Sequence, residues 1–279
     1  MGAPMARNIA NAGLGLRVWN RNRDLAQPLA DDGATVCDSP AEACDGADVV
    51  LTVLANQKVV DEVVDRARDG LKDGAVWMQS CTVSPDDSRQ FAKKAATFGI
   101  TFVEAPLLGT KGPADEGKLT VLAAATQSEA RRRVEPIVDA IGQRTVWLDE
   151  IGQPSSLKLA YNAWVLATIE GVAESLVLAK ALGVDPALVL NVIHGSASDS
   201  RSVQSKGSMM INDDLDTPSF PLAAAAKDSV LITDAARGKG FRLGIAETVR
   251  QQLALAVDDG QGHADVAATY RTSRRADGD

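Results

Sequence analysis

Short apolar runs alternate with amphipathic, helix-like segments over the first 150 residues. The run Asp48–Leu54, DVVLTVL, is typical of a buried strand. A helix is expected after Ser84 and Pro85, which suit a cap and a first turn, and it should stop at Gly99. Strands that alternate with helices favour parallel pairing through right-handed crossovers. The pattern therefore predicts a doubly wound α/β domain over residues 1–150, with strands near residues 16–19, 48–54, 75–78, 100–103, 119–123 and 145–148.

The pattern changes after residue 150, because strand-like runs largely disappear. One apolar helix of about 28 residues is expected to start near Ser155 and to stop at Gly183. Since it is apolar on most of its circumference, we expect it to be enclosed between two domains or between protomers. The sequence thus predicts an all-α C-terminal domain over residues 151–279, with further helices over residues 186–193, 222–238 and 243–258.

Composition and charge narrow the classes of partner. The 279 residues are 45% hydrophobic and 24% charged, the balance of an ordinary globular protein of one or two domains. The formal net charge is -8 and no block is rich in Lys and Arg, which argues against a nucleic acid or an anionic membrane as partner. The cluster Arg131–Arg133 has no interleaved aromatic residues and is interpreted as the solvated face of a helix.

Cysteine and histidine usage excludes several chemistries. The three cysteines are an odd number without C-x-x-C spacing, which indicates neither a disulfide framework nor a zinc site and favours a reducing cytoplasm. His194 and His263 are the two histidines, and neither has the partners of a Ser-His-Asp or metal mechanism. Glutamates interrupt the apolar stretch Leu159–Ala179, so we expect a buried helix there and no membrane span.

The first residues match the second half of a dinucleotide-binding turn. In a G-x-G-x-x-G motif the glycines allow a tight turn and a close approach of the backbone to the pyrophosphate. Gly2 corresponds to the last of these glycines, Ala3 and Pro4 to the first turn of the helix, and Gly13 to its stop. The preceding strand and the first two glycines are not in the sequence. We therefore expect the natural start to lie about 10 to 15 residues upstream, or another segment to fill the gap.

The next strand ends at a candidate nucleotide-specificity position. About 18 residues after Gly2, an NAD-specific fold usually offers a carboxylate to the ribose hydroxyls. This sequence offers Asn20, Arg21 and Asn22 instead. A guanidinium forms paired hydrogen bonds with a 2′-phosphate, which a carboxylate would repel. The segment therefore predicts NADP as cofactor in preference to NAD.

Segments along nearly the whole chain, taken in order, resemble those of one enzyme family. They are MGAPMARNIANAG, VWNRN, LTVLANQKVVDEV, SCTVSP, EAPLLGTKGPADEGKLTVLAA, GQPSSLKLAYN, FPLAAAAKDSVL and GQGHADVAATY. Together they resemble the β-hydroxyacid dehydrogenase family, the group of 3-hydroxyisobutyrate dehydrogenases and of glyoxylate or succinic semialdehyde reductases. The resemblance implies a Rossmann-like NADP-binding domain and a helical substrate and dimerisation domain. It also implies reversible hydride transfer between the cofactor and a small aldehyde or keto acid.

The resemblance implies further cofactor contacts. Leu54 and Ala55 belong to a loop that lies over the cofactor, with Ala55 where a proline is usual. Thr82 takes the place of a threonine near the nicotinamide. Lys227, followed by Asp228, belongs to an element that closes over the cofactor.

The segment after Glu104 resembles the family's substrate loop. Leu108 stands where a substrate-contacting serine is expected, which replaces a hydroxyl donor by an apolar side chain. This substitution weakens the assignment of a carboxylate substrate. The backbone N–H groups of Gly109 and Thr110 remain as donors to the substrate, with Lys111 nearby.

Lys158 and Asn162 are in register with the family's catalytic segment, although its second glycine is Pro154 here. Residues four apart project from one face of a helix. The positive end of the helix and burial should both lower the pKa of Lys158, so that it donates a proton to the forming alkoxide and takes it back in oxidation. We expect Asn162 to hold the substrate oxygen or to orient the lysine amine.

Two alternatives to a hydroxyacid dehydrogenase remain open from the sequence. One is an imine reductase of the same two-domain plan, which Leu108 favours mildly and Lys158 disfavours. The other is a helical dimerisation module that has lost cofactor binding, suggested by the first strand that the sequence lacks. In either enzyme the partner is a small molecule, and the resemblance implies a homodimer or a homotetramer. The substrate itself is not determined by these residues.

Overall fold

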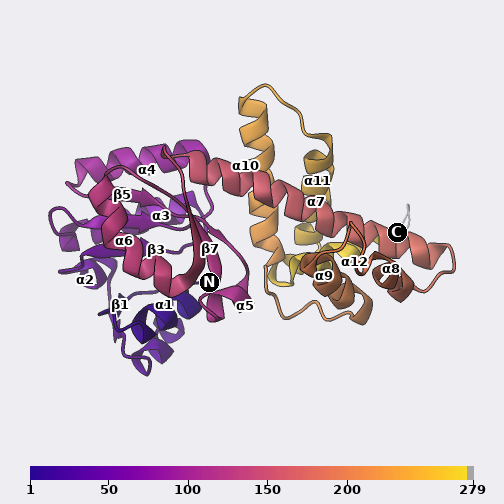
Figure 1. Cartoon of the computed structure of the whole chain (residues 1–279), viewed down its shortest axis with the longest axis horizontal. Coiled ribbons are helices and arrows are strands. Elements are labelled where there is room, and N and C mark those ends of the chain that lie inside the picture. The colour runs from indigo at the N-terminus through magenta and orange to yellow at the C-terminus, as the bar shows by residue number, and fades with distance from the viewer. Residues whose placement is uncertain (275–279) are drawn as a thin grey trace. The chain divides into compact units, whose positions relative to one another are not determined.

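The structure is a computed structural model that describes residues 1–274 (Figure 1). The chain divides into two compact units, of which the first is Met1–Lys158 and the second begins at Leu159. The division falls within one long helix, α7 (Gln153–Ala181). Each unit has its own hydrophobic core.

The first unit alternates strands and helices, as the sequence predicts. All six expected strands are present, and two further strands of two residues each, too short to give a periodic pattern, join them. Its elements are α1 (Gly2–Asn11), β1 (Arg17–Val18), β2 (Thr35–Val36), α2 (Pro40–Cys44), β3 (Val49–Thr52), α3 (Gln57–Ala67), β4 (Val76–Gln79), α4 (Pro85–Thr97), β5 (Thr101–Glu104), β6 (Leu107–Leu108), α5 (Lys111–Asp115), β7 (Leu119–Ala125), α6 (Ser128–Ile141) and β8 (Gly142–Trp147).

The main sheet is mixed, which corrects the expectation of parallel pairing throughout. Strands β3, β4 and β5 are parallel neighbours, and β7 and β8 are parallel to each other. However, β7 runs antiparallel to both β5 and β6. The reason is the connection from β5 to β7, in which the one helix is the five-residue α5. This connection contains no crossover helix long enough to return the chain for a parallel pairing.

Helix α1 packs against two sheets that are not hydrogen-bonded to each other. Strands β1 and β2 form a separate two-stranded sheet, and within the described residues β3 pairs with β4 alone. Met5 and Ile9 of α1 belong to the core of the main sheet, whereas Ala6 belongs to a small cluster with Leu16 and Val18. Side chains of one helix therefore join the two sheets.

Local signals fix the ends of the helices in the first unit. Ser84 caps α4, and Asp87 completes a reciprocal capping box with it. Gly99, just after α4, has φ +71, the left-handed conformation that a helix stop favours. Both features agree with the expected start and stop of this helix.

The second unit is helical. Besides most of α7 it contains α8 (Pro186–Ile193), α9 (Arg201–Asn212), α10 (Leu222–Gly238), α11 (Gly244–Asp258) and α12 (Thr269–Ser273). The bounds of α8 and α10 are those predicted from the sequence, and α11 starts one residue later. Helix α9 was not predicted, because its apolar residues are few and Gly207 lies within it. A Cβ on Gly207 would lie 2.5 Å from a methyl group of Leu190, so α9 packs directly against α8 there.

A buried ion pair supports α9. Lys206 Nζ lies 2.7 Å from Asp265 Oδ1, and both residues are buried. Burial alone would raise the pKa of Asp265, but hydrogen bonds from the backbone of Ala267 and from Lys206 outweigh it and hold the pKa below its ordinary value. The carboxylate also accepts the backbone N–H groups of Ser219 and Phe220. Asp265 is therefore the point at which three segments of the unit meet.

Helix α7 provides one side of the core of the second unit. It has 29 residues and is, among the described helices, the one that is long and apolar enough to cross a membrane. Leu166, Ile169 and Leu176 are nevertheless buried in the core of this unit. Glu170 is buried as well and accepts hydrogen bonds from the hydroxyls of Thr269 and Ser273. These contacts agree with the interpretation of α7 as a core helix.

Candidate active site

Three neighbouring strands end at one edge of the main sheet. Because β3, β4 and β5 are parallel, their carboxyl ends meet there, the usual place for a ligand in an open α/β sheet. Leu54 and Ala55 follow β3, and Thr82 follows β4. Leu108 lies in β6, directly after β5. The structure therefore brings the predicted nicotinamide and substrate-loop residues of the first unit to the same edge.

Cys81 connects the loops that follow β3 and β4. Its buried Sγ accepts the backbone N–H of Leu54 at 2.8 Å and lies 3.6 Å from the carbonyl oxygen of Thr52. Its own backbone is held by the side chain of Gln79, which accepts the N–H of Cys81 and donates to its carbonyl. The thiol thus fixes Leu54 and, through the neighbouring peptide, Thr82. This role of Cys81 was not predicted from the sequence.

The start of α1 is compatible with a close ligand. Gly2 is exposed, and a Cβ at this position would contact Val53 at 3.9 Å, just beyond the end of β3. Ala3 is half-buried and Pro4 is buried, so the first turn is anchored on its inner side. The first turn contains no acidic residue. Its N–H groups and the positive end of the helix can therefore bind an anion.

The turn after β1 presents a guanidinium. Asn20 Nδ2 donates to the carbonyl of Asn22 at 2.7 Å, and Asn22 Oδ1 accepts the N–H of Asp24 at 3.1 Å. The two asparagines therefore order the turn with their side chains. Arg21 between them is exposed, and within residues 1–274 its guanidinium has no hydrogen bond or ion pair.

The expected substrate loop depends on one glycine. Gly109 has φ +128, and a Cβ there would approach Leu119 Cδ2 to 2.8 Å, so only glycine fits. Leu108 before it is half-buried, and Thr110 after it precedes α5. Asn8 of α1 donates to the carbonyl of Ala114 in α5 at 2.7 Å. This hydrogen bond connects α5, which follows the loop, to α1, the helix of the predicted nucleotide-binding turn.

A buried carboxylate holds the start of α7. Glu104, the last residue of β5, is fully buried. Its Oε2 accepts the N–H of Gly152 at 2.5 Å, and its Oε1 accepts the N–H of Ser155 at 2.8 Å. The positive end of α7 is therefore already occupied by a negative charge. The expected effect of the helix end on the pKa of Lys158 remains a prediction.

Lys158 and Asn162 are both buried, at 9% and 3% exposure, one helical turn apart on α7. Asn162 Nδ2 donates to Asp228 Oδ2 at 2.7 Å. The second oxygen of Asp228 lies 2.9 Å from Lys227 Nζ, whose side chain is partly exposed. Asp228 is thus shared by an amide and an ammonium group. The bond between Asp228 and Asn162 was not predicted from the sequence.

Comparisons with known proteins identify the family. Residues 1–149 match the model described as the NAD binding domain of 6-phosphogluconate dehydrogenase. Residues 152–273 match the model described as NAD-binding of NADP-dependent 3-hydroxyisobutyrate dehydrogenase. A glyoxylate/succinic semialdehyde reductase of Arabidopsis thaliana, the chloroplastic form 2, is 30% identical over 259 residues, which cover 92% of this chain and 69% of the relative. The chain belongs to the β-hydroxyacid dehydrogenase family.

Solved structures of the β-hydroxyacid dehydrogenase type share its fold. A 3-hydroxyisobutyrate dehydrogenase from Salmonella typhimurium has a TM-score of 0.89 at 25% identity, over 97% of this chain and 95% of that one. An imine reductase from Myxococcus stipitatus in complex with NADP+ has a TM-score of 0.66 at 19% identity, over 98% of this chain and 96% of that one, a likeness of fold alone. The chain is an NAD(P)-dependent hydroxyacid dehydrogenase or reductase with a small-molecule substrate. The non-catalytic module considered from the sequence is set aside.

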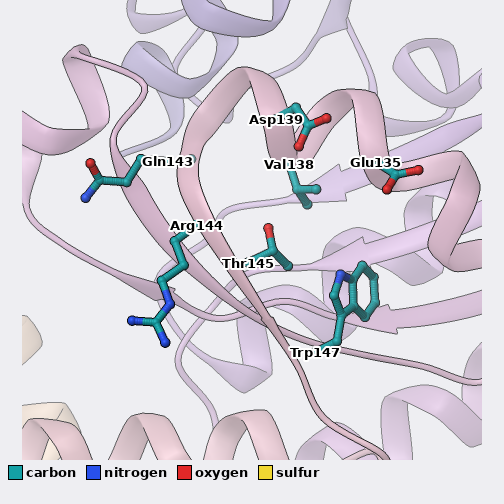
Figure 2. A pocket seen from close by; sticks show the side chains of 8 residues that line it. Glu135, Val138, Asp139, Gln143, Arg144, Thr145 and Trp147 are labelled. Atoms are coloured by element: carbon teal, nitrogen blue, oxygen red, sulfur yellow. The ribbon is translucent and has the colours of Figure 1, made fainter.

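This β-hydroxyacid dehydrogenase also has a shallow pocket away from the predicted residues. The pocket, of about 160 Å³, lies between the end of α6 and β8 (Figure 2). Arg144, Gln143 and Thr145 line it from the strand side, and Glu135 and Asp139 from the helix. Neither these residues nor the others in its lining belong to the predicted cofactor or substrate set. The pocket therefore does not mark the predicted site, whose residues lie at the strand ends of the main sheet and on α7.

Proposed function

We propose that the chain is an NADP-dependent reductase that interconverts a small aldehyde or keto acid and the corresponding hydroxy acid, with Lys158 as the proton donor and acceptor. The observation that carries the proposal is the pair Lys158 and Asn162, both buried and one turn apart on α7, with Asn162 held by a hydrogen bond to Asp228. Buried polar and ionisable groups concentrate at functional sites, which supports a catalytic role for the pair.

The residues of the first unit fit a nicotinamide dinucleotide. An open first turn on α1, an exposed guanidinium at Arg21 and two loops fixed by Cys81 would hold its phosphate, ribose and nicotinamide parts, respectively. When bound, the cofactor supplies the hydride for the carbonyl carbon. The chain must then supply a proton for the carbonyl oxygen.

Lys158 supplies that proton in the proposed reaction. Its ammonium group donates a proton to the developing alkoxide and becomes a neutral amine, and the reverse transfer accompanies oxidation of the hydroxy acid. A positioned acid of this kind contributes about a hundred- to ten-thousandfold in rate. Asn162 assists by its orientation: because Nδ2 donates to the carboxylate of Asp228, Oδ1 is left as an acceptor. It can accept a hydrogen bond from the amine of Lys158 or from the substrate hydroxyl.

Arg21 supports the preference for NADP. An exposed guanidinium that has no partner among residues 1–274 can bind a 2′-phosphate without first breaking an ion pair to them. We expect NADPH to bind at least tenfold more tightly than NADH. In Arg21→Glu the order should reverse, because the carboxylate accepts the ribose hydroxyls and repels the phosphate.

The test of the catalytic proposal is Lys158→Ala together with cofactor binding. We expect turnover of glyoxylate or succinic semialdehyde to fall at least a hundredfold in Lys158→Ala, while the Kd for NADPH changes less than threefold. Lys180→Ala, at an exposed position of the same helix, is the matched control and should keep full activity. Unchanged turnover in Lys158→Ala would exclude this residue as the proton donor.

An imine reductase is the second candidate, and Leu108 favours it. A half-buried leucine in place of a hydroxyl suits an apolar ring better than a carboxylate. Lys158 argues against it, because the resemblance places another residue there in most imine reductases. Comparing turnover of glyoxylate, succinic semialdehyde and a cyclic imine by the same enzyme preparation separates the two candidates.

A further inference from the structure

The start of α10 is not fixed by its own sequence. Pro221 precedes the helix without a side-chain cap, and the first turn contains no acidic residue. A capping side chain and an acidic first turn are the usual local signals for a helix start. The N–H of Leu222 donates instead to the carbonyl of Ala264, far along the chain, at 2.9 Å. Contacts with another segment therefore determine where this helix begins.

The segment that enters α10 is held by a short stretch around Asp265. Pro221 forms an antiparallel bridge with Asp265. The N–H of Val266 donates to the carbonyl of Phe220 at 2.8 Å. The side chain of Asp265 adds to these backbone contacts, because its Oδ2 accepts the N–H groups of Ser219 at 2.9 Å and of Phe220 at 3.2 Å. One carboxylate thus holds the residues that lead directly into the helix.

Lys206 of α9 supplies the positive charge opposite this carboxylate. Its Nζ lies 2.7 Å from Oδ1 and 2.8 Å from Oδ2 of Asp265, and it donates to the hydroxyl of Ser219 at 2.8 Å. The lysine is 6% exposed and the aspartate 0%. Because desolvation offsets most of the attraction in a buried ion pair, such a pair adds little to stability compared with apolar residues of the same volume. A role in fixing one arrangement of the chain explains its presence better.

Helix α10 carries a residue of the candidate site at a fixed distance from this ion pair. Asp228 lies six residues after Leu222, which corresponds to about 9 Å along the helix axis. Its Oδ2 accepts the side-chain N–H of Asn162 at 2.7 Å. A shift of α10 by about 1 Å along its axis can lengthen this contact beyond the range of a hydrogen bond. The position of the helix start therefore determines whether Asp228 and Asn162 meet.

We propose that Lys206 and Asp265 are positioning residues, whose ion pair holds α10 where Asp228 orients the side-chain amide of Asn162. They act on this amide through the backbone at the start of α10 and through the carboxylate of Asp228. The expected effect on turnover rests on the proposed function, whereas the effect on the amide does not depend on it.

A double-mutant cycle on turnover tests this route. Lys206→Met removes the ammonium group, and we expect kcat, measured well below Tm, to fall at least tenfold. In the background of Asp228→Ala, where Asn162 has already lost its acceptor, the same substitution should lower kcat less than twofold. Arg237→Met is the matched control, because it removes an ion pair with Glu247 near the other end of α10 and should leave kcat unchanged. An equal loss in both backgrounds, or no loss in the parent chain, overturns the proposal.

The paired substitution Lys206→Met/Asp265→Asn decides if Lys206→Met alone does not fold by circular dichroism. Removing one partner leaves a buried charge uncompensated, whereas removing both charges avoids that cost. The asparagine keeps one acceptor oxygen, which cannot serve all three backbone N–H groups that the carboxylate accepts, those of Ser219, Phe220 and Ala267. We therefore expect the paired variant to fold and to lose kcat at least tenfold. Parent turnover in this variant overturns the proposal, and failure to fold assigns the pair to stability alone and overturns it too.

The side-chain amide of Asn162 gives a readout without turnover. In a chain with isotope-labelled asparagine, the NMR signals of its NH₂ group are assigned by their loss in Asn162→Ala. We expect Lys206→Met to move these signals toward their positions in Asp228→Ala, and Arg237→Met to leave them in place. Signals that stay at the parent positions in Lys206→Met overturn the positioning role. If the parent chain shows no turnover of the tested carbonyl substrates, the proposed function fails, and these signals decide the inference by themselves.

Discussion

Replacing Glu104 by glutamine should loosen the start of α7. The fully buried carboxylate accepts two backbone N–H groups, from Gly152 and Ser155. Hydrogen bonds to a charged group contribute about 1.5 to 3 kcal/mol each. Glutamine keeps one as a neutral bond worth about 1 kcal/mol and turns an NH₂ group toward the other donor. We therefore expect Glu104→Gln to lower the free energy of unfolding of the first unit by about 3 kcal/mol.

The loss should be visible in both stability and turnover. For a domain of this size, about 3 kcal/mol corresponds to a decrease in Tm of about 6 to 12 °C. Lys158 lies three residues after Ser155, so a displaced helix start should also lower kcat about tenfold or more. Thermal and urea unfolding followed by circular dichroism, with kcat measured well below Tm, gives both quantities.

The matched control is Glu150→Gln. It makes the same charge change three residues before α7 begins, at an exposed side chain, and should alter stability by less than 0.5 kcal/mol. Equal stability of Glu104→Gln and Glu150→Gln would refute the argument that the buried carboxylate anchors the helix.

Three further changes probe the remaining parts of the site and the core. Cys81→Ala removes the acceptor of the Leu54 N–H, so we expect the Kd for NADPH, measured by fluorescence titration, to rise severalfold, with partial rescue in Cys81→Ser. Asp228→Asn lets the amide of Asn162 rotate, so kcat should fall at least tenfold while NADPH binding changes little, as steady-state kinetics and titration would report. Burial raises the pKa of Glu170 above its value in the unfolded chain, so the stabilisation linked to its protonation is fully present below the unfolded pKa and is lost as pH rises through the folded pKa. We expect Glu170→Gln to flatten this pH dependence of the free energy of unfolding, measured by urea unfolding at several pH values.

Much of the fold follows from short-range signals. A serine cap and a following glycine define α4, and aspartate and proline define the start of α8. The spacing of Lys158 and Asn162 places both on one helix face, and burial of both agrees with the sequence interpretation. Such features depend on residues within one or two turns of each other, which is why the sequence alone reveals them.

The remainder depends on partners far apart in the chain. Glu104 is 48 residues from Gly152, and Asn162 is 66 residues from Asp228, so no local pattern reveals either bond. The antiparallel placement of β7 follows from the lack of a crossover helix, which an alternating apolar pattern does not report. Helix α9 depends on the buried pair of Lys206 and Asp265, and a charged residue in a short polar segment gives no signal for burial.

The separate small sheet has a consequence for measurements of ligand binding. Among the described strands, β1 forms backbone hydrogen bonds with β2 only. A pair of two-residue strands is only marginally stable in water. The amides of Arg17 and Val18 should therefore exchange with deuterium earlier than those of β4, which has neighbours on both sides. Since Arg21 lies three residues after the end of β1, a nucleotide held by its guanidinium would slow that exchange, and mass spectrometry of this one peptide would report occupancy without any turnover.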